Sequence, residues 1–147
     1  GSDDQWSCDT SEAGNNPDTC TTDATDHSSE RSESLKVSND VGLCGYGGQA
    51  IDIESNGAET LTLDTKVQTD WWGDAHVVIE DSDGKHELKE WSNSGSEVNE
   101  GWTKYSFDIT EYDQEFRLII GNADDNTDNC DNFDHGFTIW ADDLEIS

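Results

Sequence analysis

Basic residues are scarce in this sequence. Only 7 Lys and Arg stand against 35 Asp and Glu, so the formal net charge is −28 over 147 residues. Phosphate groups are held by basic side chains, and this deficit makes nucleic acid and anionic lipid poor partners. Self-repulsion at such a charge density also destabilises a compact state in dilute buffer. Folding therefore requires strong screening of the carboxylates.

Long apolar runs are missing as well. No stretch approaches the roughly 20 apolar residues that a membrane-spanning helix needs, so we expect no membrane insertion. No signal peptide can be identified, and the opening Gly1-Ser2 is typical of a cleaved tag. We therefore expect this chain to be one part of a larger multidomain protein, with any targeting segment outside this sequence.

Intrinsic disorder is one interpretation of an acidic chain with few apolar residues. The sequence nonetheless contains 6 Trp, and its second half alternates apolar and polar residues too regularly for a polar tail. Concentrated salt would allow so charged a chain to fold, because the screening length falls to about 3 Å at about 1 M ionic strength and repulsion between the carboxylates weakens. The composition resembles that of proteins from extremely halophilic archaea, which are rich in Asp and poor in Lys.

The 4 cysteines include no Cys-x-x-Cys pair. Zinc sites usually present close pairs of ligands, whereas these residues are scattered singly, so disulfides are favoured. Disulfides imply an exported protein, either secreted or at the cell surface. We predict that Cys8 pairs with Cys20 and Cys44 with Cys130, although spacing alone does not determine connectivity. Buried free thiols in a cytosolic protein are the alternative.

Helical stripes are absent, and alternation with period two dominates from Leu35 onward. Alternating apolar residues mark strands with one buried face, and Gly, Asn and Asp turns separate them. Asp83-Gly84 is a strong hairpin turn between residues 76–80 and 85–91. The sequence therefore predicts an all-β fold, an antiparallel β-sandwich of about eight strands. The alternating residues are Leu35 and Val37; Ile51 and Ile53; Leu61, Leu63 and Val67; Tyr105, Phe107 and Ile109; Phe116, Leu118 and Ile120; and Phe137, Ile139 and Ala141.

Three segments follow one another along the sequence in a characteristic order. Ser34-Leu35-Lys36-Val37 follows a stretch of small residues, Gly101-Trp102 opens a later strand, and Asp142-Asp143-Leu144-Glu145-Ile146 ends the chain. This order resembles the galactose-binding-like jelly rolls, a family that includes many carbohydrate-binding modules of secreted glycoside hydrolases. The resemblance implies a jelly-roll sandwich over residues 27–147. Residues 1–26 are then an irregular N-terminal segment that packs on the sandwich.

The same resemblance implies a structural calcium site. In the family, the first Asp of the ending joins oxygens from the loop before the Ser-Leu-x-Val strand and an acidic residue near the start. The matching residues here are Asp142 and Ser28, with Asp9 or Asp4 in place of the family's usual Glu and Asp143 as a further candidate. Calcium accepts about six to eight oxygen ligands in flexible geometry. An ordinary hydrated surface carboxylate is the alternative for each Asp.

Sugar binding depends on aromatic side chains. The apolar face of a pyranose stacks on Trp or Tyr, while polar neighbours hold its hydroxyl groups. The best candidates are Trp71 and Trp72, which are adjacent and would point to opposite faces of a strand. Trp91 and Tyr46 lie near expected loops and complete the predicted ligand-binding set. Packing in the core is the alternative for each.

Signatures of catalysis are missing. The sequence has neither a Gly-x-Ser-x-Gly elbow nor a His-Glu-x-x-His motif. We therefore predict a non-catalytic carbohydrate-binding module of a secreted protein, which targets a neighbouring domain to polysaccharide. The alternative is a calcium-braced structural or adhesion domain of a cell-surface protein. Exposure of Trp71, Trp72 or Trp91 would favour the first function, and burial of all three would favour the second.

Overall fold

The computed structural model describes residues 19–23, 34–39, 48–69, 75–91, 97–121 and 136–147. These residues form nine strands. Among them there is no helix long and apolar enough to cross a membrane. The strands are β1 (Thr19–Asp23), β2 (Ser34–Asn39), β3 (Gly48–Glu54), β4 (Thr60–Thr69), β5 (Ala75–Asp81), β6 (Gly84–Trp91), β7 (Val98–Asp108), β8 (Glu115–Gly121) and β9 (Phe137–Ile146).

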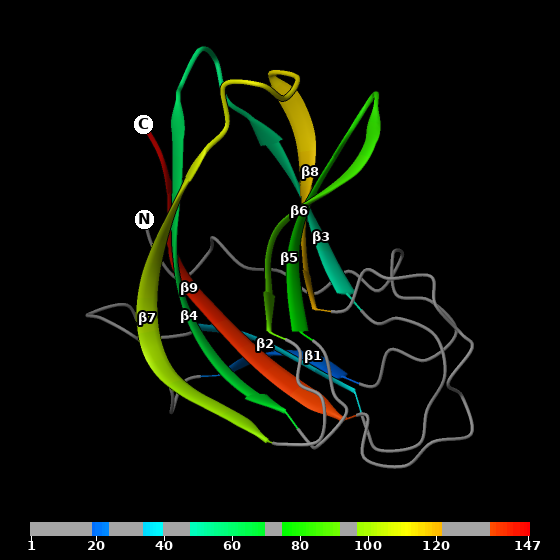
Figure 1. Ribbon diagram of the computed structural model, residues 1–147, viewed down its shortest axis with the longest axis vertical. Coiled ribbons are helices and arrows are strands. Elements are labelled where there is room, and N and C mark those ends of the chain that lie inside the picture. Colours follow the sequence, from blue (N-terminus) through cyan, green and yellow to red (C-terminus); the bar gives the residue numbers. More distant parts are fainter. Residues whose placement is uncertain (1–18, 24–33, 40–47, 70–74, 92–96, 122–135) are drawn as a thin grey trace.

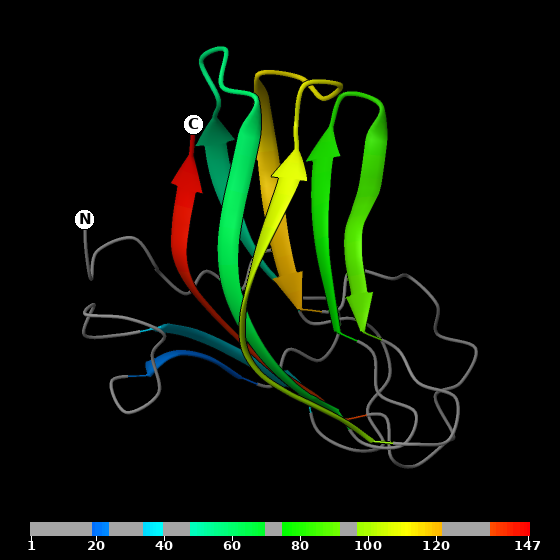
Figure 2. The ribbon, with the colours of Figure 1, turned by 60° about the vertical axis from the view of Figure 1, so that its left-hand side comes forward.

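The strands form two sheets that pack face to face (Figure 1 and Figure 2). One has five strands in the order β1-β2-β9-β4-β7, and the other has four in the order β3-β8-β5-β6. Every strand pair in the described residues is antiparallel. The predicted antiparallel β-sandwich is therefore confirmed.

The core lies between the two sheets and is built from the alternating residues. Leu61, Leu63 and Val67 of β4 are fully buried, and Leu118 and Ile120 of β8 face them from the other sheet. Burying such a side chain contributes about 1.5–3 kcal/mol to stability. Period-two patterning thus decides which face of each strand turns inward.

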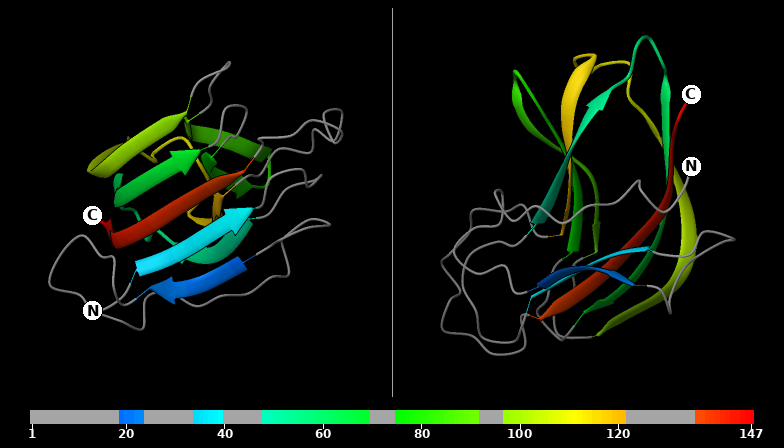
Figure 3. Two further views of the ribbon diagram at one scale, coloured as in Figure 1. Left: turned by 90° about the horizontal axis from the view of Figure 1, so that it is seen from below. Right: turned by 180° about the vertical axis from the view of Figure 1, so that it is seen from behind.

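The first strand, β1, lies inside residues 1–26, where the sequence predicts an irregular segment. It pairs along its whole length with β2, from Thr19 opposite Ser38 to Asp23 opposite Ser34. Figure 3 (left) shows it at the edge of the five-stranded sheet. Threonine favours strands, and the open edge of β2 offers unpaired backbone groups. The expectation of irregular chain is therefore wrong for these five residues.

One carboxylate, that of Asp81, joins the β5–β6 turn to the loop before β8. Its Oδ1 accepts hydrogen bonds from the backbone N–H of Asp83 and from His86 Nε2, both at 2.9 Å. Its Oδ2 accepts a bond from the backbone N–H of Asp113 at 3.2 Å. Desolvation by itself raises a carboxyl pKa, but these bonds outweigh it and hold the pKa of Asp81 below its usual value.

Replacing Asp81 with Asn is expected to lower stability at neutral pH and to weaken the loss of stability in acid. The pKa of Asp81 is lower in the folded than in the unfolded chain. Its contribution is therefore present above the unfolded value of about 4 and is lost as the pH falls through the folded pKa. Thermal unfolding at a series of pH values in molar salt measures the difference.

The matched control for this prediction is Asp83→Asn in the same turn. Asp83 is exposed, and only its backbone takes part in the Asp81 bonds. The Asp83 variant should keep the pH profile of the unmodified protein. Identical profiles for the two variants would contradict the role of Asp81.

Candidate functional site

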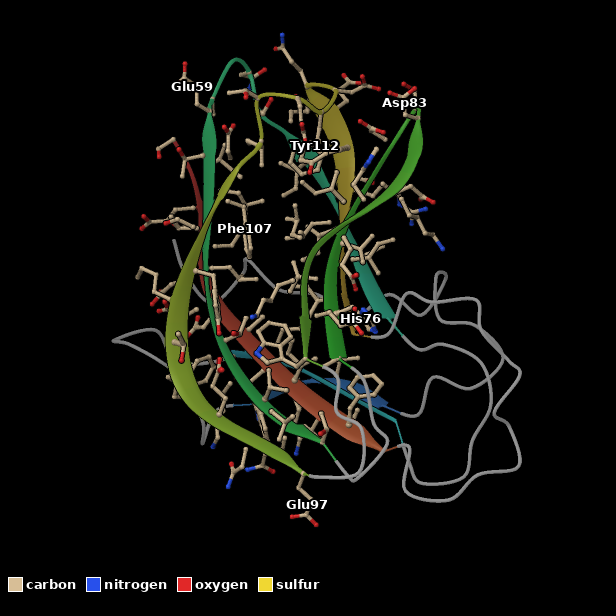
Figure 4. The ribbon with its side chains drawn as sticks, in the orientation of Figure 1. Glu59, His76, Asp83, Glu97, Phe107 and Tyr112 are labelled. Atoms are coloured by element: carbon tan, nitrogen blue, oxygen red, sulfur yellow. The ribbon has the colours of Figure 1, made fainter. Side chains whose placement is uncertain are left out.

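Three aromatic side chains, which we call the aromatic row, connect the edge strands β6 and β7. They are Trp91 at the end of β6 and Tyr105 and Phe107 on β7. The rings of Trp91 and Tyr105 meet edge to face at 5.6 Å and 79°, and those of Tyr105 and Phe107 are stacked at 6.2 Å and 12°. Figure 4 shows Phe107 on the side of β7 that faces the four-stranded sheet. The row therefore lies along the side of the sandwich where the two sheets end.

Two charged side chains accompany the aromatic row. Glu100 Oε1 accepts hydrogen bonds from the Tyr105 hydroxyl at 2.6 Å and from Trp91 Nε1 at 3.3 Å. Lys89 Nζ lies 5.7 Å from the centroid of the Trp91 ring and 5.4 Å from that of Tyr105. Such a cation–π contact contributes about 0.5–2 kcal/mol, depending on its desolvation. The row thus has an acceptor and a cationic donor beside its aromatic faces.

Burial and the Glu100 carboxylate together raise the pKa of the Tyr105 hydroxyl. Desolvation is the larger cause, and the hydrogen bond to Glu100 adds to it, so the pKa of Tyr105 lies above its usual value. The hydroxyl therefore remains a hydrogen-bond donor at neutral pH. Glu100 Oε2 accepts no hydrogen bond from the described part of the chain.

The three aromatic side chains differ in exposure. Trp91, which is predicted from the sequence to bind sugar, is only 5% exposed and belongs to the core. Tyr105 and Phe107 are half-buried and pack against the core from one side. Tyr105 and Phe107, rather than Trp91, are therefore the partly exposed side chains of the aromatic row.

The alternating pattern predicts a strand for Tyr105 and Phe107 but does not single out Lys89 or Glu100. Their positions depend on β6 and β7 both being edge strands, which only the sheet order shows. Glu100 faces inward because the register of β7 against β4 shifts between Thr65 and Val67, which places Glu100 opposite Val67. No short-range pattern in the sequence indicates this shift.

Most of the other predicted site residues lie outside the described part of the chain. Trp71, Trp72 and Tyr46 do so among the ligand-binding candidates, as do Asp9 and Ser28 among the calcium candidates. Their roles stay predictions. The same holds for the disulfides, because Cys8, Cys44 and Cys130 are outside the described residues and Cys20 is described only as part of the β1 backbone.

The two calcium candidates on β9 have different surroundings. The Asp142 side chain is fully buried, at 0% exposure, and its Oδ1 accepts a hydrogen bond from the backbone N–H of Asp143 at 2.9 Å. Asp143 is half-buried and adopts a left-handed φ of 50° where the register against β4 shifts. Across the strand pair, Asp142 lies opposite Asp64, a second buried carboxylate that the sequence does not single out. Asp64 also pairs with Lys104, with Oδ1 and Nζ 3.5 Å apart.

No protein-family model matches this sequence, and no curated protein matches it. Among solved structures, a family 29 carbohydrate-binding module with one lysine replaced by alanine aligns with a TM-score of 0.50 at 19% identity, covering 87% of this chain and 76% of that chain. Another family 29 module aligns with a TM-score of 0.48 at 20% identity, covering 85% and 70%. At these identities the likeness concerns the fold. The chain therefore has a jelly-roll-type β-sandwich similar to that of the family 29 carbohydrate-binding modules.

Proposed function

We propose that this domain is a non-catalytic carbohydrate-binding module of a secreted, halophilic protein, which targets a neighbouring domain to polysaccharide. The observation that carries the proposal is the aromatic row with Lys89 and Glu100 beside it. The fold likeness to carbohydrate-binding modules supports it. A weak sugar site joined to a catalytic domain raises the local concentration of substrate, which suits a module of this size.

The chemistry of the aromatic row matches the two needs of sugar recognition. The half-buried rings of Tyr105 and Phe107 offer apolar faces for the C–H side of a pyranose. Glu100 Oε2 accepts a hydrogen bond from a sugar hydroxyl, and Lys89 donates one. The proposed ligand-binding set also includes Trp71, Trp72 and Tyr46.

Retention on polysaccharides tests the proposal. The domain is passed over a panel of insoluble and soluble glycans in molar salt with calcium, and one glycan class is expected to retain it. Tyr105→Phe should weaken binding by about three- to tenfold, because it removes the hydrogen bond that holds the Glu100 carboxylate beside the aromatic row. Lys89→Ala should weaken it at least as much, and Ala at both Trp71 and Trp72 should weaken it most.

Tyr112→Phe is the matched control for Tyr105→Phe. Tyr112 is also half-buried, but its ring contacts His86, with centroids 4.9 Å apart, and it does not join the aromatic row. This variant should bind like the unmodified protein. Absence of retention on every glycan class would overturn the proposed function.

A second function, a calcium-braced structural or adhesion domain at the cell surface, is favoured by the buried carboxylate of Asp142. Buried carboxylates are normally paired or coordinate a metal. Asp142 with its cross-strand partner Asp64 provides the oxygen donors that calcium prefers. We therefore propose a structural Ca²⁺ held by Asp142, with Asp143, Asp9 and Ser28 as further ligands. Such a site is compatible with either function.

A further inference from the structure

A cluster of three possible metal ligands lies on the outer face of the four-stranded sheet. It consists of His76 on β5 and Glu87 and Glu90 on β6, and one ligand atom from each lies within 4.8 Å of the other two. His76 alternates with Ala75 and Val77, whose side chains are in the core, so it points outward (Figure 4). The cluster is therefore on the opposite face of the sheet from the aromatic row.

A β-bulge brings the two glutamates together. Residues three apart in a regular strand point to opposite faces. Here Glu90 lies opposite His76 and Glu87 lies opposite Val78, because the register shifts between Val77 and Val78. The extra residue, Leu88, packs against the core. Bulges of this kind re-aim side chains and are frequent beside functional sites.

The imidazole of His76 is buried, and only one of its two ring nitrogens is hydrogen-bonded within the described residues. Its side chain is 6% exposed, and its Nδ1 is hydrogen-bonded to Glu87 Oε1. Its Nε2 is buried and has no hydrogen-bond partner among the residues that the structure describes. The neighbour of His76 on β8 is Gly121, which has no side chain to offer. Buried polar atoms without a partner are uncommon, and an imidazole nitrogen is a good metal ligand.

Within the described residues, the two glutamates are not neutralised by Lys or Arg. Glu87 is hydrogen-bonded to His76, and neither Glu87 nor Glu90 forms a salt bridge with Lys or Arg there. Arg117, on the same face, lies 3.7 Å from Asp52 and from Glu80. Both glutamates are exposed, so their carboxylates can rotate to meet an ion.

We propose that His76, Glu87 and Glu90 bind a divalent transition metal, for which Zn²⁺ is the probe. One nitrogen and two carboxylate oxygens suit Zn²⁺ at distances of about 2.0–2.2 Å, with water completing the shell. Calcium prefers oxygen ligands alone, so this site is distinct from the one proposed at Asp142. A metal held here would tie the edge strand β6 to β5.

Calorimetric titration with Zn²⁺ in molar salt, with calcium in excess, tests the site. The excess calcium occupies the weak carboxylate sites, and one saturable Zn²⁺ site per chain is expected to remain. His76→Ala and Glu90→Gln should each weaken it by about tenfold or more. Glu90→Gln changes an exposed side chain without changing its size, so its effect does not depend on refolding of the core.

His86→Ala is the matched control, because His86 Nε2 is hydrogen-bonded to Asp81 at 2.9 Å and His86 belongs to no three-ligand cluster in the described residues. Its Zn²⁺ affinity should be unchanged. A Co²⁺ spectrum separates this site from cysteine, since thiolate ligands add charge-transfer absorption that His76, Glu87 and Glu90 do not. Zn²⁺ affinity that survives both His76→Ala and Glu90→Gln, or a thiolate spectrum, would overturn the proposal.

Discussion

Lowering the ionic strength from about 1 M to about 0.01 M is expected to unfold this domain, because the screening length grows from about 3 Å to about 30 Å. At the longer distance nearly all charges in a molecule of this size interact with one another, and the formal net charge of −28 makes the sum of these interactions repulsive. The described sheets show the same imbalance locally. Arg117 lies between two carboxylates, those of Asp52 and Glu80. Glu54 and Glu115 stand directly opposite each other with like charge.

Near-ultraviolet circular dichroism follows this transition, since it reports fixed packing of the aromatic side chains. Calcium is held constant in every sample so that only screening changes. The signal should weaken as salt is removed and return when salt is restored. Full retention of the signal in dilute buffer would contradict both the screening argument and the proposed halophilic character.

A single charge reversal tests whether a local pair of like charges contributes to the salt dependence. Glu115→Lys replaces a like-charge cross-strand pair with an attractive one, so its unfolding midpoint should move to lower salt. Glu97→Lys makes the same change in net charge at an exposed residue before β7, away from the Glu54–Glu115 pair. A larger shift for Glu115→Lys than for Glu97→Lys is expected. Equal shifts would mean that net charge alone, and no local pair, determines the salt dependence.

The β-sandwich could be predicted because its core follows a strict two-residue period. Leu61, Leu63 and Val67 are predicted to share one face, and all three are fully buried. Ile139 and Ala141 of β9 are predicted to share a face in the same way, and both are fully buried. Alternation depends only on backbone geometry, so the sequence is sufficient for this level of structure.

Burial and neighbours across the sheets could not be predicted in the same way. Trp140 is only 7% exposed although it faces away from the core, and its ring is flanked by Lys36 at 5.5 Å and Lys66 at 4.7 Å. Trp91 is buried because the β7 strand supplies Tyr105 and Glu100 as partners. These contacts depend on strand order, which residue spacing does not encode.

Bulges are the other feature that the sequence pattern misses. A bulge changes which residues share a face without changing the local composition. The spacing of Glu87 and Glu90 predicts opposite faces, yet both accompany His76 on one face. The register of β9 against β4 also shifts, directly beside the pair formed by Asp142 and Asp64. Both of the proposed metal sites therefore lie where regular alternation fails.

Removing calcium is expected to lower the melting temperature by about 8–16 °C. A ligand that binds only the folded state at a thousand times its dissociation constant stabilises it by about 4 kcal/mol, and each kcal/mol corresponds to about 2–4 °C in a chain of this length. The proposed ligand for this ion is the carboxylate of Asp142, which is fully buried. Thermal unfolding in molar salt, with calcium and then with chelator, measures the shift.

Variants at the two adjacent aspartates decide where that calcium binds. Asp142→Asn removes the buried charge and should abolish the response to chelator. Asp143→Asn is the comparison at a further proposed ligand, because Asp143 is half-buried, Asn retains a side-chain oxygen, and Asn tolerates its left-handed φ of 50°. This variant should keep most of the response. Chelation without effect on the unmodified protein would contradict the calcium proposal. A full response in Asp142→Asn would instead show that calcium binds elsewhere and that the buried carboxylate is compensated by protein groups alone.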